Sequence, residues 1–263
     1  MTGFDDLLRL ERLDGRRFGL EIPEDWMQGR TAFGGLVAAA AVRAIREALG
    51  DRDPLRSMHT AYVAPVRAGT AALEVEVVRQ GKHVTQAAVR ITQEGAITTC
   101  VHAALGASRP SALSIPRKLP PAPFSPEDGL EFPFLPGITP VFTQHFDYRL
   151  AGGGLPFSGS SDARLLGYCR HKGGAMGAEA VIALLDAWPT PAMNLGTRPF
   201  PASTVSWTAH LVAEVGSYQD PGWWRYEAES LTCQDGYSTT IARLFAGDEL
   251  VAWMDELVAV FDG

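Results

Sequence analysis

The chain has 263 residues, a length that suits one large domain or two medium-sized ones with an ample core. Its formal charge of −7 and its pI near 5.4 argue against nucleic acid as the main partner. No apolar run approaches the ~20 residues of a membrane span, and the acidic N-terminus lacks the features of a signal peptide. The three cysteines are far apart and form no metal-binding pattern, so we expect a cytoplasmic protein without membrane association.

The first half of the chain predicts one buried helix followed by a meandering sheet. Residues 10–22 alternate loosely, as a strand or a hairpin would. Residues 36–49 predict a helix whose first turns are apolar on all sides, which is typical of a buried helix, and Gly50 is suited to end it. The alternation of apolar and polar residues then predicts strands at 58–65, 70–79, 83–92 and 96–104.

A proline-rich segment separates the two halves. Residues 109–140 hold nine of the eighteen prolines. Proline lacks a backbone N–H donor and disfavours regular elements, so we predict a linker wrapped over the surface.

The second half repeats the order of the first. A strand at 142–148 and a mobile loop at 152–161 precede a strand at 167–172, and an apolar helix at 178–188 ends before Pro189. Further strands are expected at 205–214, 223–233, 237–245 and 250–261. One helix followed by an antiparallel meander, made twice, predicts two similar units at residues 1–108 and 141–263.

At several positions the sequence resembles the acyl-CoA thioesterase II family of double-hotdog thioesterases. The resemblance rests on Phe-Gly-Gly at 33–35 before the first helix, on the strand at 58–69 with its closing proline and glycine, and on Arg-Gln-Gly at 79–81. It covers both halves and weakens in the linker. It implies an α+β double hotdog, with two helix-wrapped antiparallel sheets in one chain.

The resemblance also implies a catalytic trio that holds the hydrolytic water. The family has an aspartate on the second helix, a threonine at the start of the next strand and a glutamine on the last strand, and these positions fall on Asp186, Thr204 and Glu256. Glu256 departs from the pattern, because an ionised glutamate only accepts hydrogen bonds whereas glutamine also donates. If Glu256 faces Asp186, one pKa of the pair should rise, and the protonated member could donate in place of glutamine.

The two carboxylates also have purely structural interpretations. Asp186 could lie on a solvated stripe at the end of its helix, where the helix dipole disfavours a carboxylate by ~0.3–1 kcal/mol. Glu256 could face solvent, since it alternates with Asp255 and one of the two must point outward.

Gly34 and Gly35 are predicted to bind the thioester oxyanion, because the N–H groups at a helix start are unpaired donors. Glycine is equally suited to an ordinary turn into a helix. Thr204 could likewise be only a strand-start residue, with Ser206 and Thr208 as alternative hydroxyls.

The sequence thus predicts an acyl-CoA thioesterase that hydrolyses a fatty or other acyl-CoA to the free acid and CoA, with no cofactor and no metal. The expected partner is the acyl-CoA substrate, and homodimerisation is expected from the family alone. One alternative is a hotdog enoyl-CoA hydratase or dehydratase, although no aspartate–histidine pair is evident on the second helix. The other is a non-catalytic hotdog protein that binds an acyl thioester.

Overall fold

A computed structural model describes residues 2–50, 53–118, 121–122, 124–215 and 220–263. The first half of the chain consists of one long helix and strands that curve around it. Its elements are α1 (Phe4–Leu7), β1 (Glu11–Asp14), β2 (Arg17–Ile22), η1 (Glu24–Trp26), β3 (Met27–Gln28), β4 (Thr31–Ala32), α2 (Gly34–Leu49), β5 (Leu55–Tyr62), β6 (Gly69–Gln80), β7 (Thr85–Gln93) and β8 (Ala96–Leu105). The apolar start of α2 is buried as predicted, and Gly50, with φ of 77°, ends the helix.

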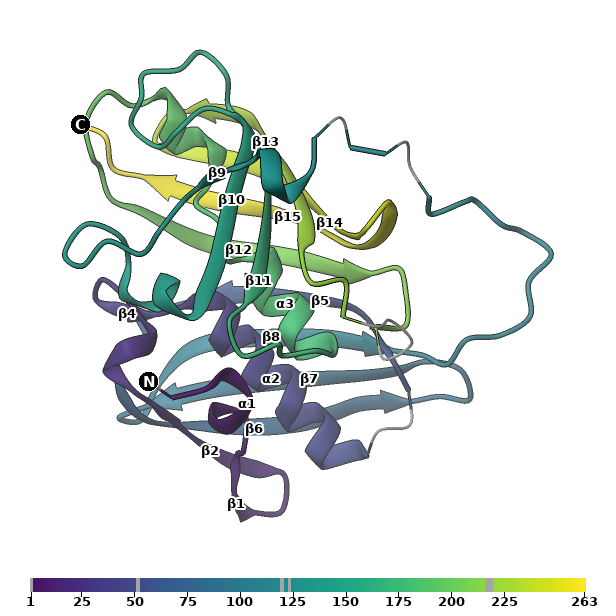
Figure 1. Cartoon of the computed structure of the whole chain (residues 1–263). Coiled ribbons are helices and arrows are strands. Elements are labelled where there is room, and N and C mark those ends of the chain that lie inside the picture. Colours follow the sequence, from purple (N-terminus) through teal and green to yellow (C-terminus); the bar gives the residue numbers. More distant parts are fainter. Residues whose placement is uncertain (1, 51–52, 119–120, 123, 216–219) are drawn as a thin grey trace.

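The second half repeats this plan around a shorter helix (Figure 1). Its elements are η2 (Pro126–Asp128), β9 (Leu130–Glu131), η3 (Val141–His145), β10 (Phe146–Gly153), β11 (Arg164–His171), α3 (Ala178–Leu185), η4 (Pro191–Leu195), β12 (Ala202–Leu211), β13 (Trp224–Gln234), β14 (Tyr237–Ala246) and β15 (Glu249–Val260). The predicted order of one helix followed by a meander is therefore present in both halves. The unit boundaries at residues 108 and 141 stay predictions.

Several local predictions differ from the structure. Helix α3 ends at Leu185, before the predicted end at residue 188, so Asp186 follows the helix instead of lying on it. Residues 142–145 belong to the 3-10 helix η3 instead of a strand. Gly152 and Gly153 belong to β10 instead of a mobile loop, because their backbones pair with Leu166 and Leu165 of β11. The proline-rich segment contains η2 and the short strand β9, which pairs with β10.

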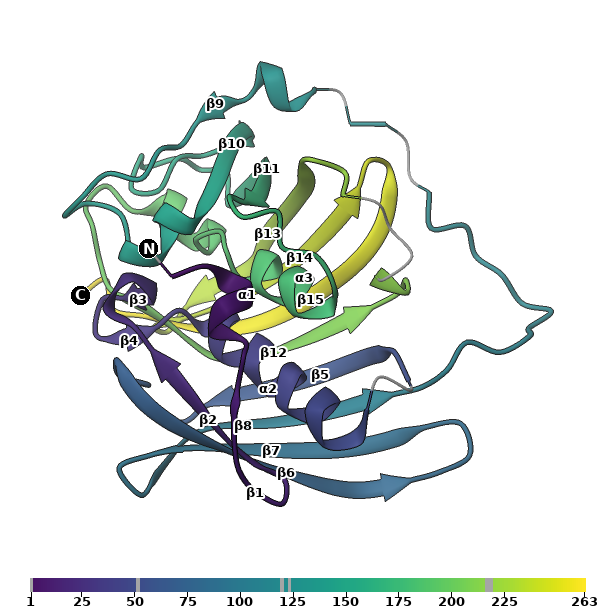
Figure 2. The same ribbon diagram turned by 60° about the horizontal axis from the view of Figure 1, so that its bottom comes forward.

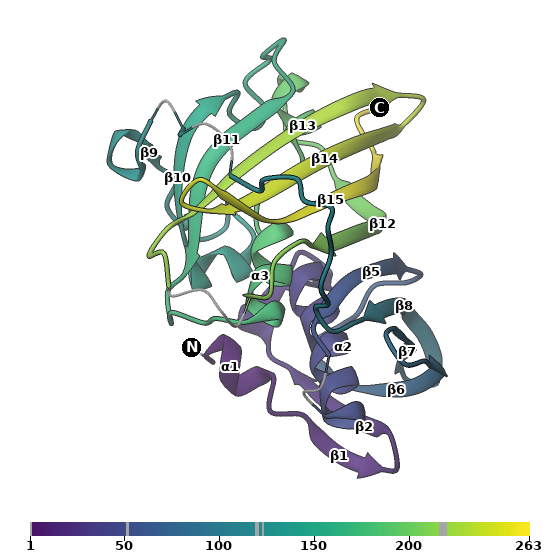
Figure 3. The ribbon, with the colours of Figure 1, turned by 90° about the vertical axis from the view of Figure 1, so that its right-hand side faces the viewer.

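Most of the described strands join into one continuous sheet and not into the two sheets that we predicted, while β3 and β4 form a separate two-stranded sheet. Within the described ranges, thirteen strands lie in the order β1-β2-β6-β7-β8-β5-β12-β15-β14-β13-β11-β10-β9, and every pair is antiparallel. The two halves meet along β5 and β12, where Thr60 lies opposite Trp207 (Figure 3). This pairing satisfies the backbone groups of two strands that would otherwise be open sheet edges. The hotdog layout of each half is retained.

Helices α2 and α3 lie side by side inside the curved sheet, in opposite directions (Figure 2). The start of α2 meets the last turn of α3 so closely that a Cβ on Gly35 would lie 3.0 Å from the Ala183 Cα. At the other end, Arg46 of α2 lies 2.7 Å from the carboxylate of Glu179 in the first turn of α3. Each helix start therefore faces the end of the other helix.

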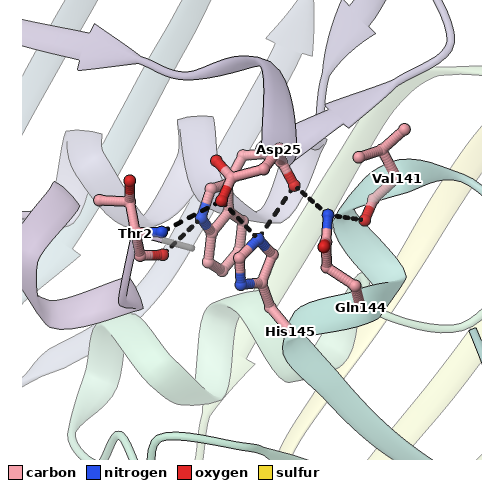
Figure 4. A network of polar contacts seen from close by, with 6 residues as sticks. Thr2, Asp25, Val141, Gln144 and His145 are labelled. Atoms are coloured by element: carbon pink, nitrogen blue, oxygen red, sulfur yellow. Dashed lines mark hydrogen bonds and ion pairs between the residues drawn. The ribbon is translucent and has the colours of Figure 1, made fainter.

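A cluster of aromatic and polar side chains anchors the start of α2 to the second half. The Phe33 N–H donates to the Trp26 carbonyl oxygen at 2.9 Å, and the Phe33 ring stacks on Phe142 with centroids 4.1 Å apart. His145 stacks on Trp26 at 4.0 Å, and its Nε2 lies 2.9 Å from the Asp25 carbonyl oxygen (Figure 4). The turn that precedes Gly34 is thereby fixed against η3.

None of the helices in the described ranges has the length and hydropathy of a membrane span.

Candidate active site

Asp186 lies where the end of α3 meets the start of α2. It directly follows α3, and a Cβ on Gly34 would lie 2.9 Å from its Oδ2. The Gly35 N–H donates a hydrogen bond to this carboxylate. Asp186 thus occupies the negative end of its own helix dipole and the positive end of its neighbour's.

The environment of Asp186 makes its carboxyl a candidate base. Burial raises the pKa of Asp186 to about 7, and the hydrogen bond from Gly35 offsets only part of that effect. Within the described part of the chain, no lysine or arginine forms a salt bridge with it. The Asp186 residue as a whole is only partly buried. A carboxyl that titrates near neutral pH can accept and return a proton under physiological conditions.

Glu256 lies on the inner face of β15, and Asp255 faces outward. The Glu256 residue is only 8% exposed. Burial first, and then the charge of Asp186, raises the pKa of Glu256 to about 8. The Thr204 hydroxyl donates to Glu256 Oε2 at 3.5 Å, and Thr240 on β14 forms a further hydrogen bond. The two carboxyl groups therefore form one electrostatically coupled pair at the site.

Thr204 reaches the inner face through a β-bulge. Trp207 lies opposite Glu256, and regular alternation from Trp207 would turn Thr204 to the outer face. The register shifts between Thr204 and Ser206, which leaves Val205 as the extra residue and returns Thr204 to the side of Glu256.

The two alternative hydroxyls on β12 do not reach the site. Ser206 and Thr208 alternate with the buried Trp207 and therefore face outward. The Thr208 hydroxyl lies 3.1 Å from Nδ1 of the exposed His59. Of these three hydroxyls on β12, only that of Thr204 bonds Glu256.

Two aromatic residues that the sequence did not single out for the site complete it. The Tyr62 hydroxyl, at the end of β5, donates to the Gly34 carbonyl oxygen at 2.9 Å. The same hydroxyl accepts a hydrogen bond from Trp207 Nε1 at 2.9 Å. The Trp207 side chain is buried, but its indole N–H is directed at the site. Alternation along β5 places Tyr62 inward, and this was the only available signal.

The structure brings the five predicted site residues, Gly34, Gly35, Asp186, Thr204 and Glu256, to one place between the two halves. The Gly35 N–H is already engaged by Asp186, and the oxyanion role of both glycines stays a prediction. In the described ranges, no group of three or more His, Cys, Asp or Glu side chains is arranged to hold a metal ion. The cluster can therefore offer a proton acceptor, hydrogen-bond donors and the positive end of a helix.

Family profiles match most of the chain. A profile of the acyl-CoA thioesterase N-terminal domain matches residues 22–106, and one of the acyl-CoA thioesterase C-terminal domain matches residues 116–260. No curated protein sequence gives a significant match.

Several solved structures share the complete fold. A conserved protein of unknown function with a hot dog fold from Alicyclobacillus acidocaldarius has a TM-score of 0.89 at 23% identity, over 99% of this chain and 98% of that one. A putative thioesterase II from Thermobifida fusca has a TM-score of 0.83 at 22% identity, over 99% and 98%. Acyl-CoA thioesterase II TesB2 from Mycobacterium marinum has a TM-score of 0.78 at 16% identity, over 99% of both chains. At these identities the likeness establishes the fold alone.

Proposed function

The chain belongs to the acyl-CoA thioesterase family, and from this premise we propose that it hydrolyses an acyl-CoA to the free acid and CoA at the Asp186 end of the helix pair. One observation carries the proposal. A carboxyl with a pKa near neutrality, Asp186, lies at the start of α2 within electrostatic range of the inward-facing Glu256. Strongly perturbed pKa values cluster at functional sites.

Asp186 acts as the general base in this proposal. It takes a proton from a water molecule while the water oxygen attacks the carbonyl carbon of the thioester. The tetrahedral intermediate then collapses, the carbon–sulfur bond breaks, and the CoA sulfur receives the proton that Asp186 had taken. The products are the free acid and the CoA thiol, so the proposed reaction balances without a cofactor.

Glu256 takes the place of the family's glutamine as a neutral acid. A pKa raised to about 8 keeps most of this carboxyl protonated at pH 7, so it can donate a hydrogen bond as the glutamine amide would. Thr204, whose hydroxyl bonds Glu256, helps to orient the attacking water. The exchange of glutamine for glutamate therefore preserves the donor but makes it dependent on pH.

The start of α2 stabilises the oxyanion that forms on the thioester carbonyl. The helix dipole places partial positive charge there, and backbone N–H groups are fixed donors. Since the Gly35 N–H already holds Asp186, we assign the contact with the oxyanion to the Gly34 N–H.

A panel of acyl-CoA substrates with a free-thiol assay tests the proposal. The purified protein should release thiol from at least one saturated acyl-CoA, at a rate that rises with protein concentration. Hydration of an enoyl-CoA without thiol release would support the hydratase alternative. Binding of an acyl-CoA with neither reaction would support a non-catalytic role. Homodimerisation stays an expectation from the family, which light scattering can check.

A further inference from the structure

Tyr62 and Trp207 form a hydrogen-bonded chain that crosses from the second half of the protein to the first. The indole N–H of Trp207, on β12, donates to the Tyr62 hydroxyl on β5 at 2.9 Å. That hydroxyl in turn donates to the Gly34 carbonyl oxygen of α2 at 2.9 Å. Trp207 is 1% exposed, so its N–H is shielded from solvent and depends on this partner.

The hydrogen-bonded chain from Trp207 continues through a single peptide unit to Asp186. The carbonyl of Gly34 and the N–H of Gly35 belong to the same peptide bond, and the Gly35 N–H donates to the Asp186 carboxylate. A hydrogen bond accepted by a peptide oxygen polarises the unit and strengthens the donor at its nitrogen. The donor of Trp207 therefore acts on Asp186 through three successive hydrogen bonds.

We propose that Tyr62, held by Trp207, is a positioning residue that fixes the Gly34–Gly35 peptide and so aims the Gly35 N–H at Asp186. The effect of Tyr62 on catalysis rests on the proposed function, whereas its effect on the Gly35 hydrogen bond does not. A hydrogen bond to the ionised form of a carboxyl stabilises that form. The chain thus favours the ionised, proton-accepting state of Asp186 against the cost of burial.

The protonation states around Asp186 are consistent with this direction. Burial, followed by the charge of Asp186, raises the pKa of Tyr62, so its hydroxyl keeps the proton that it donates. In the part of the chain that the structure describes, the charge of Asp186 also raises the pKa of Tyr148 on β10, Tyr226 on β13 and Glu256 on β15. The Tyr148 hydroxyl donates to the Ala187 carbonyl oxygen, so of the tyrosines it is Tyr62 that bonds the peptide next to Asp186.

Titration of Asp186 in Tyr62→Phe and Trp207→Phe tests the proposal directly. The protein is labelled with carboxyl carbon-13 aspartate, and the Asp186 resonance is identified as the one that Asp186→Asn removes. Tyr62→Phe should raise the pKa of Asp186 by roughly half a pH unit or more, and Trp207→Phe should raise it by less. The double variant should match Tyr62→Phe alone, because Trp207 acts through Tyr62.

Tyr168→Phe is the matched control. Its hydroxyl also donates to a backbone carbonyl oxygen, that of Phe124 at 2.7 Å, but it lies outside the site. This variant should leave the titration of Asp186 unchanged. In kinetics, Tyr62→Phe should lower kcat and move the acidic limb of the pH profile upward, with little change in KM.

Two results distinguish a failure of the positioning role from a failure of the proposed function. If folded Tyr62→Phe and Trp207→Phe both leave the pKa of Asp186 unchanged, the proposed chain is wrong even when the protein hydrolyses acyl-CoA. If the titration shifts as expected but no acyl-CoA is hydrolysed, the proposed function fails and the positioning role stands. Should either variant fail to fold, as circular dichroism would show, the other still decides.

Discussion

At one end of the helix pair the start of α2 faces Asp186, and at the other end the start of α3 faces Arg43 and Arg46. The second end is closed by an ion-paired carboxylate. Glu179, in the first turn of α3, is 3% exposed, and its oxygens lie 2.7 Å from Arg46 Nη1 and 3.4 Å from Arg43 Nε. Among the described residues no cation pairs with Asp186 in this way, and Asp186 shares its end with another carboxyl.

The difference shows how one fold plan, used twice, can give one structural and one reactive end. A carboxylate at a helix start between two arginines has its charge compensated and interacts favourably with the helix dipole. A carboxyl buried without a cation has a raised pKa, because burial disfavours its ionised form. Once ionised, that carboxylate readily takes up a proton.

Asp186→Asn should produce the largest effect. It should lower kcat for thioester hydrolysis by at least ~100-fold, since asparagine keeps the size and hydrogen bonding but cannot accept the proton of water. Glu179→Gln, the same change at the closed end, should keep kcat within about threefold, because Glu179 takes no part in the proposed mechanism. Equal losses in the two variants would contradict the assignment of the site to one end.

The same variant makes an independent prediction about stability. The folded-state pKa of Asp186 lies above the value of a free aspartate, so the folded protein binds more protons than the unfolded chain between about pH 4 and pH 7. Stability from this group is therefore present at low pH and is lost as the pH rises through about 7. Asp186→Asn should raise the melting temperature at pH 8 relative to wild type. A lower melting temperature at pH 8 would mean that the carboxylate is stabilised in a way that these contacts do not reveal.

Removing both arginines at the closed end should affect stability and not chemistry. Arg43→Met with Arg46→Met leaves the buried Glu179 without those partners, and we expect a loss of roughly 2 kcal/mol, reduced by the partial exposure of both arginines. Urea unfolding measures this loss. Arg90→Met, which breaks an exposed pair with Glu76, should cost less than about 0.5 kcal/mol. A double variant no less stable than this control would show that the closed end contributes nothing.

Gly34→Ala should disturb the open end through its Cβ. That atom would lie 2.9 Å from both the Asp186 carboxylate and the Tyr62 hydroxyl, so one of them must move. Displacement of a base from its working position should lower kcat by about tenfold. The control is Gly173→Ala, near the closed end, where a Cβ would meet nothing within 4 Å. Full activity in Gly34→Ala would show that this close approach is not needed.

Glu256→Gln should have the smallest effect on the maximal rate and a distinct effect on its pH dependence. In wild type the rate should rise as Asp186 loses its proton near pH 7 and fall as Glu256 loses its proton near pH 8. The glutamine variant should keep the rising limb and lose the alkaline fall, since an amide donor does not titrate. An unchanged profile would place Glu256 outside the chemistry.

Much of the fold follows from local patterns in the sequence. The apolar run of α2 and the two-residue alternation of β6 predict these elements close to their observed bounds. The single sheet does not follow, because the β5–β12 pairing joins strands about 150 residues apart and no local pattern encodes it. Glycine is depleted in strands, so the sequence predicts a loop at Gly152 and Gly153. Pairing with β11 nevertheless keeps both residues in a strand.

The candidate site was only partly predictable. The family resemblance points to Asp186 and Glu256, whose catalytic roles stay predictions, and Glu256 faces inward. The face of β12 on which Thr204 lies does not follow from the sequence. Strand residues normally alternate between the two faces, and the bulge at Val205 breaks that alternation. The role of Tyr62 depends on a contact with the Gly34 carbonyl that only the assembled halves create.

A structure of the protein with a non-hydrolysable ketone analogue of an acyl-CoA tests the central claim most directly. The analogue's carbonyl stands for the thioester carbonyl. We predict that this carbonyl lies at the start of α2, with its oxygen within hydrogen-bonding distance of the Gly34 N–H, and that Asp186 lies within reach of a water beside the carbonyl carbon. A carbonyl bound at the start of α3, beside Glu179, would contradict the account.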